Sequence, residues 1–173
     1  MQDLIADIKR ALCAEAYISA LSLALVLPDI CGQIEFPHSS SGKEQYIEWY
    51  DKHMLWPSDM TKEEILDGEK CYKLRCALLH SGNKSGVPVD EFELSIERIS
   101  KQGDYSEFGA YGCSSFGSTW STKDNGETFN KKHHIRLDVG QLCCWLCMGA
   151  EAFYDKWEDK SAFGAHTPNI IRI

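Results

Sequence analysis

An apolar helical run that carries an arginine and a histidine and then stops at a glycine constrains this chain more than any other stretch. The run is Cys-Tyr-Lys-Leu-Arg-Cys-Ala-Leu-Leu-His-Ser-Gly-Asn, residues 71–83. Its apolar side chains lie on two helical faces, one with Cys71, Leu74 and Leu78 and the other with Tyr72, Cys76 and Leu79. We therefore expect a helix that is packed on several sides and brings two reactive side chains into largely buried surroundings.

Arg75 and His80 stand five residues apart in this run. Five residues correspond to about 500° of α-helix, so on a regular helix the two side chains would lie roughly 140° apart. They converge only if the last turn of the helix loosens. Gly82-Asn83 is typical of a left-handed C-terminal cap, so the sequence predicts that the helix ends there.

This Arg-x-x-x-x-His pattern, followed by Ser-Gly-Asn, resembles the signature of the HEPN superfamily, whose small helical domains occur in prokaryotic toxins and defence proteins. The resemblance covers residues 1–82 and 138–159 and implies a metal-independent ribonuclease without a cofactor. In that family the arginine and histidine of two protomers meet across a dimer interface, and RNA is cleaved by its own 2′-hydroxyl. The resemblance therefore implies a homodimer, RNA as substrate and Arg75 and His80 as catalytic residues.

The chemistry of these two side chains agrees with that expectation. A histidine with a pKa near 6.5 accepts a proton from a 2′-hydroxyl or returns one to the leaving oxygen, and an arginine holds the phosphate and its developing charge. Ser81 and Asn83 are candidates for neutral hydrogen bonds to phosphate or base, and equally for turn residues. The structural alternative is that Arg75 pairs with an acidic group and His80 caps a helix end.

Two positions depart from the family pattern. Cys76 follows the arginine where active members usually carry Asn, Asp or His, and Gly82 replaces the tyrosine of the subgroup that is regulated by nucleotidylation. The second functional hypothesis is therefore a catalytically inactive HEPN-like module that binds a nucleotide, RNA or a protein partner such as an antitoxin.

Two further side-chain sets suggest other chemistry. The Cys76/His80 and Cys143/Cys147 pairs are each four residues apart, so two helices could supply a zinc site, although core packing is the simpler interpretation. A Cys76–His80 nucleophilic pair is a third reading of the same helix. A local basic cluster, in which Lys132 and His134 are candidates for RNA binding, comprises Lys131 to His134 and Arg136. The alternative for this cluster is a solvated strand edge.

The composition indicates one globular domain over residues 1–173. A net charge of −8 argues against a broad basic surface, so RNA contacts would be local. Most of the eight cysteines fall in apolar helical segments, which favours free thiols in the cytoplasm. The apolar run from Ala16 to Leu27 is interpreted as a core helix, with no membrane partner.

The chain order predicts a mainly α fold, an HEPN-like helical bundle with a small β-hairpin or sheet between the motif helix and the C-terminal helix. We expect one helix from Asp3 to Leu27, ended by Pro28 and Gly32, and capped helices that begin at Ser41, Thr61, Asp67 and Asp138. Alternating side chains predict strands within the β-rich insertion at 88–137, around Phe92 to Ile96 and His133 to Val139. Residues 160–173 are expected to form a tail.

Overall fold

The computed structural model describes residues 1–54, 65–81, 92–95 and 135–166, and this part of the chain is mainly helical, as predicted. Its elements are α1 (Gln2–Cys13), α2 (Tyr17–Ala24), α3 (Leu27–Glu35), α4 (Gly42–His53), α5 (Gly68–Cys76), the π-helix η1 (Ala77–Ser81), β1 (Phe92–Ser95), β2 (Ile135–Asp138), α6 (Val139–Lys156) and α7 (Ser161–His166). Predictions at 55–64, among them the helix expected to start at Thr61, lie outside the described residues.

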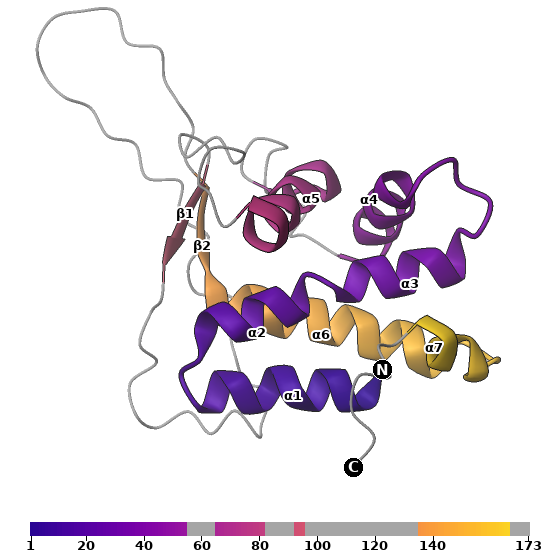
Figure 1. Cartoon of the computed structure of the whole chain (residues 1–173), viewed down its shortest axis with the longest axis horizontal. Coiled ribbons are helices and arrows are strands. Elements are labelled where there is room, and N and C mark those ends of the chain that lie inside the picture. Colours follow the sequence, from indigo (N-terminus) through magenta and orange to yellow (C-terminus); the bar gives the residue numbers. More distant parts are fainter. Residues whose placement is uncertain (55–64, 82–91, 96–134, 167–173) are drawn as a thin grey trace, which may run out of the picture.

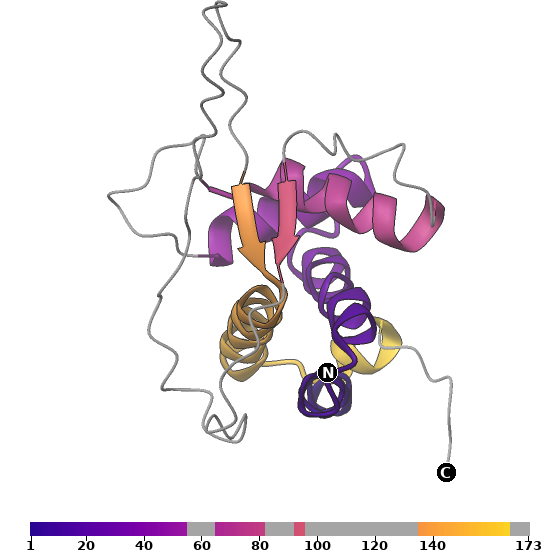
Figure 2. The same cartoon turned by 90° about the vertical axis from the view of Figure 1, so that its left-hand side faces the viewer.

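The helices form two sets with different directions. Helices α1, α2, α3 and α6 run along the length of the molecule, whereas α4 and α5 lie across them on one side (Figures 1 and 2). Packing between α3 and α4 and between α2 and α6 encloses one hydrophobic core among the described residues. Its largest fully buried side chains include Trp49, Tyr46, Tyr50, Phe163, Ile8, Leu12, Leu21, Leu25, Leu27, Leu66 and Leu142. Burial of these side chains supplies most of the driving force for folding.

The prediction of one long helix from Asp3 to Leu27 was wrong, because the chain turns between α1 and α2. Glu15 has a φ of 56°, in the left-handed region. The amide of Ala16 donates to the carbonyl of Ala11 at 2.8 Å, and that of Glu15 donates to Leu12 at 3.0 Å. These are the two hydrogen bonds of a Schellman cap, which usually has glycine at the left-handed position. A glutamate there concealed the helix end.

Pro28 and Gly32 do not end a helix, contrary to the prediction. Pro28 lies in the first turn of α3, where a missing amide proton costs nothing, and α3 continues to Glu35. Gly32 is buried where α3 crosses α4. A Cβ atom at this position would lie 2.4 Å from the carbonyl oxygen of Gln45, so only glycine permits this close approach.

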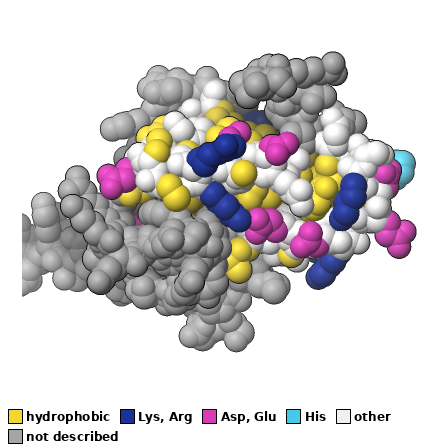
Figure 3. Space-filling view, turned by 90° about the horizontal axis from the view of Figure 1, so that it is seen from below, with side chains coloured by type: hydrophobic (Ala, Val, Ile, Leu, Met, Phe, Trp, Pro, Cys, Tyr) yellow, Lys and Arg dark blue, Asp and Glu magenta, His cyan; other side chains and the backbone are white. Residues whose placement is uncertain are grey.

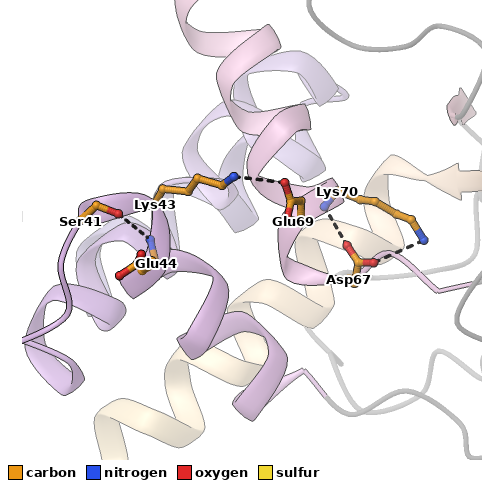
Figure 4. A network of polar contacts seen from close by, with 6 residues as sticks. All are labelled: Ser41, Lys43, Glu44, Asp67, Glu69 and Lys70. Carbon is orange, nitrogen blue, oxygen red and sulfur yellow. Dashed lines mark hydrogen bonds and ion pairs between the residues drawn. The ribbon is translucent and has the colours of Figure 1, made fainter.

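The predicted N-terminal caps of α4, α5 and α6 are confirmed. Ser41, Asp67 and Asp138 each accept a hydrogen bond from the backbone amide three residues later, at 3.3, 2.8 and 2.7 Å. An ion pair joins two of these helices, because Lys43 Nζ of α4 lies 3.1 Å from Glu69 Oε1 of α5 (Figure 4). The start of the motif helix is thus tied to α4 as well as capped.

The two described strands are parallel, so they are not the two arms of a hairpin. Phe92 lies opposite Ile135, and the register continues to Ser95 opposite Asp138. Parallel neighbours need a crossover of a dozen or more residues, whereas a hairpin joins antiparallel strands. The intervening segment, 96–134, lies outside the described residues. Strand β2 leads directly into α6, because its last residue, Asp138, is also the N-terminal cap of that helix.

The segment predicted as a tail begins with a packed helix. Phe163 of α7 is buried, and its ring lies 5.8 Å from the ring of Phe153 and 4.8 Å from that of Tyr154. Helix α7 also packs against α3. The short sequence Ser-Ala-Phe-Gly-Ala-His has one large apolar residue, too few for a helical pattern to be recognised.

One described stretch, Tyr17–Glu35, is apolar and long enough to cross a membrane by length and composition, with a mean hydropathy of 1.5. In this fold it comprises α2 and α3, and 56% of it is buried against the rest of the protein. A helix in the core of a soluble protein can have the same length and apolar composition.

Candidate functional site

The motif helix changes its geometry between Arg75 and His80. Helix α5 is an α-helix to Cys76, and the next five residues, Ala77–Ser81, form a π-helical turn. Hydrogen bonds in a π-helix join residues five apart, and such turns frequently lie at functional sites. The widened turn reduces the angular separation of positions 75 and 80 relative to a regular α-helix. The loosening that the sequence required for convergence is therefore present in the backbone.

Arg75 is held by an ion pair with Asp29 of α3. Its Nε donates to Asp29 Oδ2 at 2.9 Å, and the two side chains are only 19% and 16% exposed. The guanidinium carbon also lies 5.9 Å from the centre of the Tyr72 ring, within the range of a cation–π contact. The predicted structural alternative, an acidic partner for Arg75, is confirmed. This pairing also fixes the arginine in a defined place.

The surroundings keep Arg75 charged. Burial opposes its positive charge, but the carboxylate of Asp29 and the hydrogen bond to Cys76 outweigh that effect and raise its pKa. The pKa of Tyr72 is raised by burial and by its hydrogen bond to Cys76, although the charge of Arg75 acts in the opposite direction. Cys76 thus influences the pKa of both the tyrosine and the arginine, and its identity bears directly on the environment of Arg75.

A buried polar contact joins α5 to α4 next to Tyr72. The hydroxyl of Tyr46, on α4, lies 3.3 Å from Cys71 Sγ, and the Tyr46 ring lies 5.4 Å from that of Tyr72 in an edge-to-face arrangement. Burial raises the pKa of Cys71 to about 12 and that of Tyr46 well above its ordinary value. Both groups are therefore neutral at physiological pH and act as fixed packing elements.

The other predicted site residues are placed only in part. His80 and Ser81 belong to the backbone of η1, but their side chains lie outside the described part. Asn83, Lys132 and His134 lie wholly outside the described residues. Their roles as substrate-binding residues stay predictions.

The alternative zinc site gains no support from the cysteines. Cys143 and Cys147 are buried on α6, and burial raises the pKa of Cys147 to about 12. A thiol must lose its proton to bind zinc. A raised thiol pKa makes this loss of the proton less favourable, so it opposes zinc binding by Cys147. Among the described residues, no three His, Cys, Asp or Glu side chains gather as metal ligands. Cys76 therefore does not share a ligand cluster with the two cysteines of α6.

Asp29 was not identified from the sequence. It lies in the first turn of α3, a position where a helix dipole favours a carboxylate. The signal was present in the order Pro-Asp, which is typical of a helix start. Because Pro28 was interpreted as a helix end, Asp29 was not recognised as part of the first turn of a new helix.

The charged side chains on one face of the molecule are of both signs. The face seen from below includes α1, and Lys, Arg, Asp and Glu side chains alternate on it with hydrophobic ones (Figure 3). Arg10 pairs with Asp7 within α1, and Lys9 of α1 pairs with Glu151 of α6. In the part of this face that the structure describes, basic side chains do not form a continuous surface, in keeping with the net charge of −8.

Comparisons with protein families, with curated proteins and with solved structures find no match to this chain.

Proposed function

We propose that this chain is a metal-independent endoribonuclease of the HEPN type that cleaves single-stranded RNA through its 2′-hydroxyl. Arg75 stabilises the phosphate charge, and His80 transfers protons. No cofactor takes part. The observation that carries the proposal is the π-helical turn Ala77–Ser81, which begins two residues after Arg75 and contains His80. A role as a toxin or phage-defence effector in the cytoplasm, restrained by an antitoxin, fits this chemistry.

The proposal is supported by the state of Arg75. The guanidinium is charged at physiological pH, and its carboxylate partner raises its pKa further, as suits a group that neutralises the pentacoordinate phosphorus centre of the reaction. Its largely buried side chain also lies in a region of lowered dielectric, which strengthens its interaction with a phosphate. Leu79 is 36% exposed and stands beside His80 on the π-helical turn, so an apolar residue borders the proposed site.

The reaction needs one proton acceptor and one proton donor, whereas each chain contributes one motif histidine. We therefore expect a two-fold dimer in which two motif turns meet, each protomer supplying Arg75 and His80. Sedimentation at micromolar concentration should give twice the monomer mass, and replacing Leu79 by aspartate should shift the protein toward monomer and lower activity. A monomer that cleaves RNA at full rate would contradict the composite site.

The direct test is an RNA-degradation assay in EDTA. Single-stranded RNA should be cut slowly to products with 2′,3′-cyclic phosphate ends, because its flexible backbone lets the 2′-hydroxyl align with the leaving oxygen. Duplex RNA should be cut far more slowly, and a DNA strand of equal sequence should be inert because it lacks the nucleophile. Cleavage of DNA, or a strict requirement for a divalent metal, would contradict the mechanism.

A second candidate function is a catalytically inactive module that binds a nucleotide, RNA or a protein partner. The Arg75–Asp29 ion pair favours it, because a paired arginine fulfils a structural role without substrate. The cysteine at position 76, where active relatives usually have a polar residue, favours it as well. This candidate predicts binding of single-stranded RNA without turnover.

A further inference from the structure

The ion pair between Asp29 and Arg75 connects helices α3 and α5, and Asp29 lies outside the Arg-x-x-x-x-His motif. Asp29 and Arg75 are 46 residues apart in sequence, and their contact links the first turn of α3 to the last turn of α5. Both side chains are more than four-fifths buried. A charged hydrogen bond that is shielded from water is strong and has a defined direction. It is therefore suited to holding a guanidinium in one orientation.

Asp29 itself stands on a rigid element. The residues on both sides of it, Leu27, Pro28, Ile30 and Cys31, are buried in the core. Helix α3 is packed against α4, α6 and α7, so its first turn has little freedom to move. The partial positive charge at a helix N-terminus also favours the ionised carboxylate at this position.

The guanidinium also lies near the Tyr72 ring, whose centre is 5.9 Å from its central carbon. Tyr72 in turn packs against the buried ring of Tyr46. Arg75 therefore contacts both a carboxylate on α3 and an aromatic ring that packs against a buried residue of α4. The arrangement restricts the arginine to a small part of its rotamer range, which reduces the entropy lost when it binds a phosphate.

We infer that Asp29 is a positioning residue, which holds the Arg75 guanidinium where the proposed reaction uses it. The inference rests on the proposed ribonuclease function. Asp29 touches no reacting atom and acts only through Arg75. A displaced catalytic group loses rate steeply, since about 1 Å of misplacement can cost 100-fold. Loss of Asp29 should therefore affect turnover more than RNA binding.

The test compares Asp29→Asn with Glu35→Gln. Both acids are on α3 and largely buried, and Glu35 pairs with Lys52 at 2.5 Å and His53 at 2.6 Å, away from Arg75. We expect Asp29→Asn to lower kcat for single-stranded RNA by about 10- to 100-fold with little change in KM. Glu35→Gln should lower the melting temperature about as much as Asp29→Asn does. It should leave kcat within about twofold of the wild type.

A second measurement follows Arg75 without reference to catalysis. The Nε–Hε NMR signal of Arg75, assigned by its loss in Arg75→Lys, should be protected from solvent exchange in the wild type and in Glu35→Gln. In Asp29→Asn it should exchange faster. If Asp29→Asn does not fold, Asp29→Glu, which moves the carboxylate by one methylene, gives the same comparison.

The outcomes separate this inference from the proposed function. An unchanged Nε–Hε signal or an unchanged kcat in Asp29→Asn would overturn the positioning role, as would an equal loss of kcat in Glu35→Gln. A wild-type protein that cleaves no RNA would overturn the proposed function, and the NMR comparison would then decide by itself whether Asp29 holds Arg75.

Discussion

Replacing Gly32 by alanine is expected to lower the free energy of unfolding by about 3 kcal/mol, a large part of the stability of an ordinary domain. The added Cβ would lie 2.4 Å from the Gln45 carbonyl oxygen, 2.7 Å from its carbon and 3.3 Å from the Tyr46 amide nitrogen. All three atoms are backbone, so no side chain can rotate away. Helices α3 and α4 would have to separate, and the contacts that bury Tyr46 and Trp49 would loosen.

Thermal unfolding measured by circular dichroism checks this expectation, with Gly42→Ala as the matched control. Gly42 begins α4, and a Cβ there would meet no atom within 4 Å. Its replacement should be neutral or stabilising by up to about 1 kcal/mol, because alanine favours helix. Gly32→Ala should lower the melting temperature by about 10 °C. Equal melting temperatures for the two variants would contradict the close helix crossing.

The capped helices were predictable because their signals are local. Ser41, Asp67 and Asp138 each stand immediately before a helical pattern, and their side-chain bonds reach only three residues ahead. The break at Glu15 was not predictable in the same way, because a left-handed cap with glutamate has no distinctive residue. The close crossing at Gly32 was also hidden, since it depends on Gln45, which is thirteen residues away and on another helix.

The candidate site shows the same division between local and distant information. The motif predicted that Arg75 and His80 lie on one helix and that the last turn of this helix must loosen. The backbone of that turn, Ala77–Ser81, is π-helical. The partner of Arg75 came from α3, 46 residues earlier, and no local pattern relates the two. Strand pairing was missed for a similar reason, because alternation identifies a strand but not the direction of its neighbour.

Replacing His80 by alanine is expected to reduce RNA cleavage by about 100- to 10,000-fold, because the site loses its proton-transfer group. Arg75→Ala should reduce it by about 100- to 1,000-fold through loss of the charge that stabilises the phosphate. The rates are measured in EDTA with a fluorescent single-stranded RNA. Two exposed residues supply matched controls: His38→Ala in the connection between α3 and α4, and Arg10→Ala on α1. Both controls should retain the wild-type rate.

The Cys76→Asn variant tests whether position 76 limits the site. Cys76 follows Arg75 and influences its pKa and that of Tyr72, so an asparagine there would place an amide near the guanidinium and the phosphate that it is proposed to bind. If the cysteine weakens the site, the rate should rise at least several-fold. An undiminished rate in His80→Ala would indicate another active centre or a contaminating nuclease. No cleavage by the wild type or by Cys76→Asn, across varied single-stranded RNAs, would leave the binding module as the better account of Arg75 and its partner Asp29.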